Sequence, residues 1–197
     1  MPTSRSPYHH GDLRAACLRA AMELLEEGGA TALSLRAVAR RAGVSPAAPY
    51  RHYADRDALI SAVAAVGYRE LAEQLAAAHP SPSTADDFGA IAVAYVQFAL
   101  QRPALFRVMF AEPCDTDNSE RVAATDAISE YVSAIVRQSF PGFDTEALST
   151  AAWALVHGLA FLHLDGKLDA STPEVVSNRV RAAVHAVLTV SRAAEGV

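Results

Sequence analysis

The sequence predicts an all-α protein of about nine helices, and three observations lead to this fold class. Apolar residues recur at spacings of three and four along most of the chain, as on one face of an amphipathic helix. The alternation of Val, Ile, Thr and aromatic residues that is typical of strands is scarce. Serine, threonine, proline and glycine interrupt the apolar pattern where helices would begin and end. With hydrophobic residues at 51%, the 197 residues are enough for one or two packed domains.

One stretch, Ser34–Tyr53, predicts two short helices joined by a tight turn. Gly43 suits the left-handed residue that ends the first helix, because glycine has no Cβ. Ser45 can cap the second helix, with Pro46 at its first helical position. The apolar face of the first helix comprises Leu35, Val38, Ala39 and Ala42. This is the pattern of a helix-turn-helix, whose second helix can enter the major groove of DNA.

The remaining helices follow from the same apolar spacing. Asp55 is predicted to cap one of them, Thr84 and Asp87 form a capping-box-like start for another, and Thr172 with Pro173 begins the last. Residues 79–84 contain two prolines and mark a linker. The helices are expected at about 12–27, 56–78, 85–101, 103–110, 120–140, 145–164 and from 173 onward. An acidic loop is expected at Glu112–Ser119.

The charge distribution favours a DNA-binding module at the N-terminal end. Residues 1–56 hold eight arginines and five acidic residues, which gives a net charge of +3 with histidine neutral. The rest of the chain carries −8, so the whole chain has a net charge of −5. A basic module on an acidic body suits a protein whose first part binds phosphate and whose remainder does not.

Residues 8–71 resemble the DNA-binding domain of the tetracycline-repressor (TetR/AcrR) family. The resemblance rests on LRAACLRAAMELLEEGG, on SLRAVARRAGVS and on YRHYADRDAL, in which Tyr50 and His52 precede an aromatic residue. Trp153, His157 and Gly158 resemble the Trp-x-x-x-His-Gly signature of one branch of the family. Residues 1–10 are expected to form a flexible arm. The resemblance implies a helix-turn-helix domain at 11–71 with its motif at 34–53, and a ligand-binding and dimerisation domain at 72–197.

The resemblance also implies which residues would contact double-stranded DNA. Tyr50, His52 and Arg56 would hold the phosphate backbone, whereas Ser34 and Arg36 match positions that touch the backbone or nearby bases. The full expected set is Ser34, Arg36, Ser45, Pro46, Ala47, Ala48, Tyr50, Arg51, His52 and Arg56. Tyr53 is expected to lie in the core instead.

Two features of the second helix depart from the family pattern. Pro49 stands where the family has an apolar residue such as leucine, and a proline lacks the N–H that a helix uses. The groove-facing residues Ala47 and Ala48 can contact a thymine methyl group but cannot make a bidentate bond to guanine or adenine. Base reading is therefore expected from Arg36, Ser45 and Arg51, together with DNA shape.

An unidentified small and partly apolar effector is expected to bind in the C-terminal domain. The residues expected to line its cavity are Tyr95, Phe98, Phe106, Met109, Phe110, Trp153, His157 and Phe161. An alternative stays open at this point: the same aromatic residues are also suited to ordinary packing in the hydrophobic core. His157 in particular suits either a ligand contact or a core histidine with a hydrogen-bond partner.

A homodimer is expected from the last two helices, packed as a four-helix bundle with those of a second subunit. The expected interface comprises Ala152, Leu155, Leu159, Val176, Val180, Val184 and Val187. Such a dimer would place two recognition helices on a palindromic operator. The whole protein would then be a transcriptional repressor that the effector releases from DNA.

Other classes of function find little support in the sequence. It contains no G-x-S-x-G, Walker, G-x-G-x-x-G or H-E-x-x-H motif, so no enzyme is expected. No metal site or cofactor is expected, since Cys17 and Cys114 lie far apart and His157 and His163 share no helical face. Neither a signal peptide nor a membrane span is expected, and a cytoplasmic location fits best. A helical adaptor without DNA activity is the remaining alternative, which the basic N-terminal part disfavours.

Overall fold

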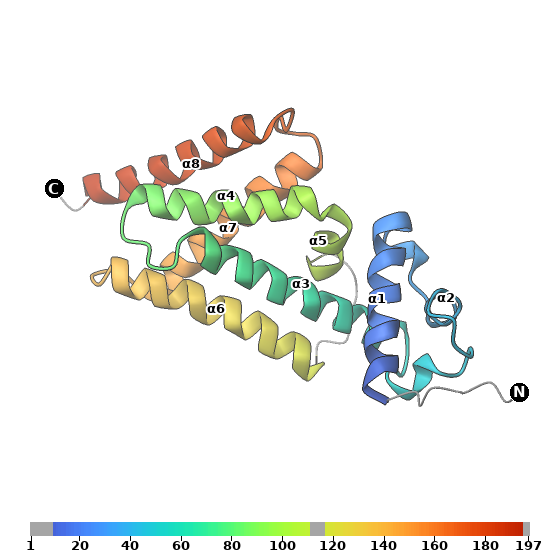
Figure 1. Ribbon diagram of the computed structural model, residues 1–197. Helices are drawn as coiled ribbons and strands as arrows, with labels where there is room; N and C mark the ends of the chain where they lie inside the picture. The colour runs from blue at the N-terminus through green and yellow to red at the C-terminus, as the bar shows by residue number, and fades with distance from the viewer. Residues whose placement is uncertain (1–9, 111–116, 195–197) are drawn as a thin grey trace, which may run out of the picture. The chain divides into compact units, whose positions relative to one another are not determined.

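The structure is a computed structural model that describes residues 10–110 and 117–194. The described residues form α-helices and two short 3-10 helices without a strand, which confirms the predicted fold class. In chain order they are α1 (His10–Gly28), η1 (Ala30–Ala32), α2 (Leu35–Arg41), η2 (Pro49–Arg51), α3 (Arg56–Ala78), α4 (Ala85–Gln101), α5 (Pro103–Phe110), α6 (Ser119–Ser139), α7 (Thr145–Leu164) and α8 (Pro173–Ala194) (Figure 1). Residues 1–9 of the expected arm and residues 112–116 of the expected acidic loop, with Cys114, lie outside the described part.

The described chain divides into two compact units. The head unit comprises the described residues of Met1–Gly67 and Ala104–Val122, and it contains α1, α2, α5 and the first half of α3. The body unit comprises the described residues of Tyr68–Pro103 and Ala123–Val197, with the second half of α3, α4, most of α6, α7 and α8. Helix α3 is thus shared between the two units.

The head unit is built around the apolar face of α1. That face contains the buried residues Leu13, Cys17, Ala20, Ala21 and Leu25. Cys17 has no exposed surface, and burial raises the pKa of its thiol, as expected for an inert core cysteine. Tyr53 is also buried, as predicted, and its hydroxyl lies 3.5 Å from the carbonyl of Arg14.

The predicted start and end of the first motif helix, α2, are confirmed. The Ser34 hydroxyl accepts a hydrogen bond from the backbone N–H of Ala37 at 3.1 Å, so Ser34 is the N-cap. At the other end Gly43 has a φ of 68°, the left-handed conformation that glycine adopts without strain. The N–H groups of Gly43 and Val44 bond back to the last turn of α2, at 3.3 and 3.0 Å. These bonds set the angle at which the chain leaves α2.

The predicted second helix of the motif is wrong as an α-helix. Residues 45–52 form consecutive turns that end in the 3-10 helix η2, with bonds from Ala48 N–H to Ser45 and from His52 N–H to Pro49, both 2.9 Å. The physical reason is Pro49, which has no N–H to donate to the carbonyl four residues earlier. We refer to residues 45–52 as the recognition segment. Its absence as a helix accounts for the difference between the nine α-helices expected and the eight present among the described residues.

The body unit is organised around α4, which packs against both α7 and α8. In Figure 1, α4 and α8 lie side by side, with α7 behind α4. Eight residues of α4 are buried: Gly89, Ala92, Val93, Ala94, Tyr95, Val96, Phe98 and Ala99. Apolar faces on two sides of one helix explain why α4 holds the other two in place.

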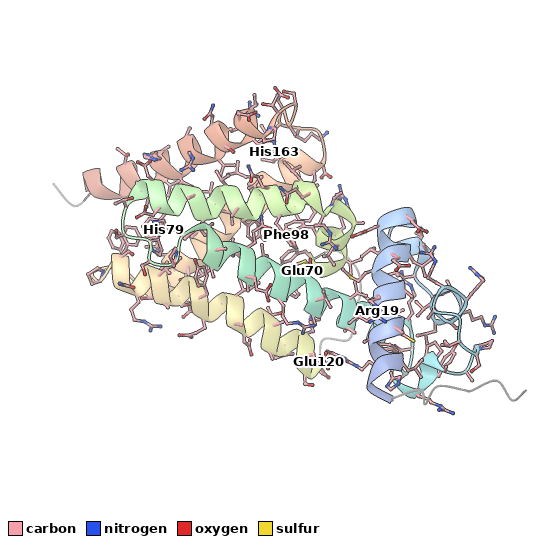
Figure 2. All side chains as sticks on the ribbon, viewed as in Figure 1. Arg19, Glu70, His79, Phe98, Glu120 and His163 are labelled. Carbon is pink, nitrogen blue, oxygen red and sulfur yellow. The ribbon has the colours of Figure 1, made fainter. Side chains whose placement is uncertain are left out.

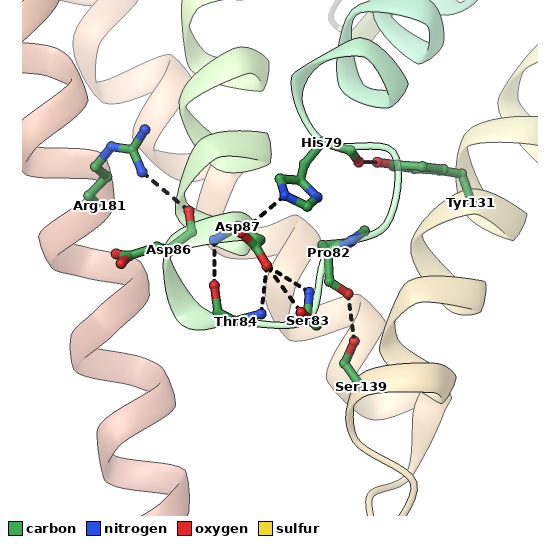
Figure 3. Close-up of polar contacts among 9 residues, drawn as sticks. All are labelled: His79, Pro82, Ser83, Thr84, Asp86, Asp87, Tyr131, Ser139 and Arg181. Carbon is green, nitrogen blue, oxygen red and sulfur yellow. Dashed lines mark hydrogen bonds and ion pairs between the residues drawn. The ribbon is translucent and has the colours of Figure 1, made fainter.

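The α4 N-terminus is held by a network of polar bonds (Figure 3). The predicted capping box of Thr84 and Asp87 is present, and the Asp87 carboxylate also accepts from the Ser83 N–H at 2.9 Å. These backbone donors lower the pKa of Asp87 to about 2. Asp87 further pairs with His79 Nε2 at 3.1 Å. The linker between α3 and α4 is therefore an ordered corner rather than a loose hinge.

Candidate nucleic-acid interface and aromatic cluster

The recognition segment presents small, mostly apolar side chains to solvent. Ser45, Pro46 and Ala47 are exposed and Ala48 is half-buried, whereas Pro49 is buried and faces the core of the head unit. The buried Pro49 fixes which side of the segment points outward. The four expected groove-facing residues are thus adjacent, with three of them exposed.

Two arginines of the head unit are paired with acidic residues of the same unit. Arg14 donates to both oxygens of Glu120, at 2.7 and 2.8 Å, and Arg41 pairs with Glu27 and Glu23. These two charges are compensated within the head unit.

A second group of arginines is left for an external anion. Arg36, Arg40 and Arg51 are exposed, and no described residue forms an ion pair with any of them. They lie on α2 and at the end of the recognition segment. The sequence alone does not indicate Arg40 as a DNA contact, because it does not distinguish Arg40 from Arg41. Only the structure shows that Arg41 pairs with acidic residues of α1.

Two of the residues expected to hold phosphate differ in their exposure. Tyr50 is 52% exposed, so much of this residue is accessible to a partner. His52 is half-buried, and its Nε2 is a buried atom without a hydrogen-bond partner among the described residues. Tyr50 therefore suits a phosphate contact directly, whereas His52 needs its ring to move before Nε2 can reach one.

Arg56 is already engaged inside the head unit. Its Nε donates to the carbonyl of Leu33 at 3.2 Å and its guanidinium donates to the carbonyl of Ala30 at 2.8 Å. These bonds satisfy carbonyls at the η1 turn, next to the N-cap of α2. In this arrangement Arg56 positions the motif from within, and a direct phosphate contact would be additional.

The body unit contains an aromatic cluster made by Tyr95, Trp153, His157 and Phe161. The Trp153 Nε1 donates to the Tyr95 oxygen at 3.4 Å, and that oxygen lies 3.0 Å from His157 Nδ1. Ring centroids are 5.8 Å apart for Trp153 and His157 and 4.9 Å apart for His157 and Phe161. The spacing of four along α7 places these three rings on one side of the helix.

The proton positions in this cluster follow from its chemistry. Since an indole nitrogen only donates, Tyr95 accepts from Trp153 and can give its own proton to His157 Nδ1. Burial lowers the pKa of His157 and raises the pKa of Tyr95, so both groups are neutral at pH 7. We assign the remaining His157 proton to Nε2.

The other residues expected to line the effector cavity are divided between the units. Phe98 is buried on α4 in the body unit (Figure 2). Phe106, Met109 and Phe110 belong to α5 in the head unit, where the Phe106 and Phe110 rings are 4.8 Å apart. The structure therefore brings together four of the eight expected residues, those of the aromatic cluster.

The residues expected at a dimer interface also fall into two groups. Leu159, Val176, Val180 and Val184 are buried within the subunit, and the face of α8 that carries the three valines lies against α4. Ala152 and Leu155 are half-buried, and Val187 is 45% exposed. The buried residues have little surface left for a second subunit.

A different face of α7, which we call the free face, is exposed in the described part of the chain. Its exposed residues include Ala147, Ala151, Ala154, Gly158 and Leu162. By length and composition, α7 alone among the described helices could cross a membrane, and only 17% of its most apolar window is buried. Much of this apolar helix thus has no packing partner among the residues that the structure describes.

An all-helical chain with a capped turn motif and exposed arginines beside it has features that are typical of regulatory proteins of the helix-turn-helix class. Residues 18–63 match the family model for bacterial regulatory proteins of the tetR family, and residues 88–188 match the model of the tetracyclin repressor-like C-terminal domain. The chain belongs to the TetR family.

Known proteins resemble different parts of this chain. An HTH-type transcriptional regulator of Mycobacterium tuberculosis is 35% identical over 92 residues, which are 45% of this chain and 39% of that protein. A solved protein of unknown function from Rhodococcus sp. RHA1 is 36% identical with a TM-score of 0.76, covering 92% of this chain and 98% of that one. A tetR-family regulatory protein from Rhodococcus RHA1 shares the fold at 22% identity, with a TM-score of 0.64 and coverage of 88% and 95%.

Proposed function

We propose that this protein is a transcriptional regulator that binds an operator in double-stranded DNA. The observation that carries the proposal is a group of exposed arginines beside the recognition segment, Arg36, Arg40 and Arg51, which form no ion pair with any described residue. The chain as a whole is acidic, with a net charge of −5. A cluster of exposed arginines in such a chain favours the binding of an anionic partner at that surface. Membership of the TetR family supports the same conclusion.

The experiment for DNA binding is selection from a random duplex library with the full-length protein. Repeated rounds should enrich one motif, and the enriched duplex should bind more tightly than a scrambled duplex at the same salt concentration. Placed between a promoter and a reporter gene, the motif should lower expression when the protein is present, because we propose repression. Enrichment of no motif, together with equal binding to both duplexes, would rule out operator recognition.

We further propose that the operator is palindromic because the protein acts as a homodimer. The free face of α7, with the exposed residues Ala182, Ala186 and Val187 of α8, supports a four-helix contact between two copies. The interface in this proposal differs from the valine ridge of α8, which is used inside the subunit.

The two glycines of α3 and α7 support the position of this interface. A Cβ on Gly67 would lie 2.6 Å from the Met109 sulfur, so packing inside the head unit requires a glycine there. A Cβ on Gly158 would meet nothing within 4 Å, although a mid-helix glycine costs roughly 1 kcal/mol relative to alanine. Close packing against a second copy would explain why position 158 is a glycine, which packing within the subunit does not explain.

The regulation we propose is release by a small and partly apolar effector at the aromatic cluster. The cluster combines aromatic surface with hydrogen-bonding groups on Tyr95, Trp153 and His157, which is the usual character of a small-molecule site. To cause release, the effector must bind more tightly to the conformation that does not fit DNA. A molecule with an apolar body and one hydrogen-bond acceptor suits the His157 proton on Nε2.

Trp153 is the single tryptophan of the chain, so its fluorescence reports on this cluster. A compound library can be screened for changes in that emission, and each hit then tested for release of the selected duplex. His157→Ala should weaken a true effector and its releasing activity together, because one donor is lost. Hits that release DNA with unchanged potency from His157→Ala would place the effector site elsewhere.

A further inference from the structure

Residues 45–49, the first part of the recognition segment, offer a DNA partner very few hydrogen-bonding groups. From Ser45 to Pro49 the only polar side chain is the Ser45 hydroxyl. Pro46 and Pro49 also lack a backbone N–H, so the main chain contributes fewer donors than an ordinary turn. The exposed surface of Pro46 and Ala47 is hydrocarbon. The hydrocarbon surface of Pro46 and Ala47 cannot distinguish bases by their donors and acceptors.

The same segment is held in one conformation. Two prolines fix φ at their positions, and the bonds from Ala48 N–H to Ser45 and from Arg51 N–H to Ala48 close consecutive turns at 2.9 and 3.2 Å. On one side the segment continues from the capped end of α2, and on the other it is anchored by the buried Tyr53. Its small apolar surface is therefore preformed, and little ordering is needed when a partner binds.

The major groove presents one apolar group at a base edge, the 5-methyl group of thymine. We propose that Pro46 and Ala47 recognise thymine methyl groups, so that each operator half-site carries A·T pairs where these two residues enter the groove. The inference rests on the proposed DNA-binding function. In this proposal Arg36 and Arg51, which the sequence suggested as base readers, join Arg40 in attracting phosphate around this surface, and the methyl contacts supply the sequence preference.

The size of the effect follows from the area involved. Removing one buried methyl group from an apolar contact weakens binding about three- to fivefold, the range that corresponds to burial of a single carbon. Two such contacts in each half-site of a symmetric operator give a marked preference for thymine, even when no side chain makes two hydrogen bonds to one base.

The test changes the DNA and leaves the protein intact. In the duplex selected by the full-length protein, each thymine is replaced singly by deoxyuridine, which removes only the methyl group. At constant salt, one or two positions in each half-site should lose about three- to fivefold in affinity, and the other positions should not change. 5-Methylcytosine placed against guanine at a weakened position should not restore full affinity, but it should bind better than cytosine there.

Two variants assign the effect to the segment. In Ala47→Gly the selected duplex and its deoxyuridine counterpart should bind equally at the position that Ala47 reads. The matched control is Arg51→Ala, which should weaken both duplexes by the same factor because its contribution is electrostatic.

Loss of thymine-methyl recognition and loss of operator binding give different experimental results. A selected duplex that binds as tightly with deoxyuridine at every thymine position would overturn methyl recognition and leave reading by DNA shape. Failure to select any duplex would instead count against the proposed function. Unchanged discrimination between thymine and deoxyuridine in Ala47→Gly would remove Ala47 from the reading surface.

Discussion

Arg56 supports the helix-turn-helix motif from within the head unit. Its guanidinium bonds to the carbonyls of Leu33 and Ala30 and so supports the turn that leads into α2. The family resemblance suggests a phosphate contact, whereas the geometry assigns Arg56 a positioning role. The distinction matters because loss of either role weakens DNA binding.

Arg56→Ala should lower the free energy of unfolding by about 1–3 kcal/mol, because two carbonyls lose a charged donor. Urea denaturation measures this change, and Arg36→Ala, which removes an exposed arginine, should stay within about 0.5 kcal/mol of the parent. If positioning is its main role, Arg56→Ala should bind DNA less tightly with an unchanged salt dependence. A stable Arg56→Ala protein with a shallower salt dependence would instead identify a phosphate contact.

His163, near the end of α7, makes stability sensitive to acid (Figure 2). Its side chain is 3% exposed, and burial, followed by the charge of Arg179, lowers its pKa in the folded state. The unfolded chain therefore binds the proton more readily, and stability falls as the pH drops below about 6.5, the ordinary pKa of histidine. Above that pH the contribution is constant.

His163→Leu should reduce the loss of unfolding free energy between pH 7.5 and 5.5, measured by urea denaturation at each pH. Part of the loss should persist, because burial also lowers the pKa of His157. The Asp87 carboxylate, with its pKa of about 2, titrates outside this range. A parent protein equally stable at both pH values would contradict the prediction.

At the scale of elements, local chemistry predicted helix ends well. Ser34, Asp55, Thr84 and Thr172 all accept hydrogen bonds from the first turns of their helices. A cap needs only neighbours in sequence, which is why it can be recognised without a structure. The second motif helix was predicted from the same kind of signal, with Ser45 as the cap and Pro46 in the first turn. That prediction was wrong because Pro49 lacks the N–H that an α-helix needs at this position.

Replacing that proline should restore the helix. Pro49→Leu supplies an N–H that can bond to the Ser45 carbonyl, so residues 46–52 should become α-helical. Carbon-13 chemical shifts of the Cα atoms would report the change, and Pro46→Ala serves as the control, since the first turn of a helix needs no N–H there. Shifts in Pro49→Leu that stay as in the parent would show that another feature prevents the helix.

At the scale of the whole molecule, the sequence could not assign apolar faces to their partners. The valines of α8 have helical spacing, but that pattern is the same whether the face meets α4 or a second subunit. In the structure Val176, Val180 and Val184 lie against the subunit's own core. Likewise, aromatic residues grouped into one expected cavity belong partly to the head unit and partly to the body unit, a division set by tertiary packing.

Gly158→Leu tests the proposed dimer at the free face of α7. The new side chain begins in open space within the subunit, so folding should be retained while close packing of two copies is blocked. Sedimentation should show a dimeric parent and a dissociation constant raised at least about tenfold in the variant. Ala127→Leu, at an exposed alanine of α6, should remain as dimeric as the parent. A monomeric parent, or an unchanged constant in Gly158→Leu, would contradict this interface.

The central claim is that DNA binds to the exposed arginines of the head unit, and the salt dependence of affinity tests it most directly. For the selected duplex, the logarithm of the binding constant should fall linearly with the logarithm of salt concentration. Arg40→Ala and Arg51→Ala should each reduce the steepness by about 0.9, the value for one phosphate contact, whereas Arg137→Ala on α6 should not. A slope that Arg40→Ala and Arg51→Ala leave unchanged would contradict the claim.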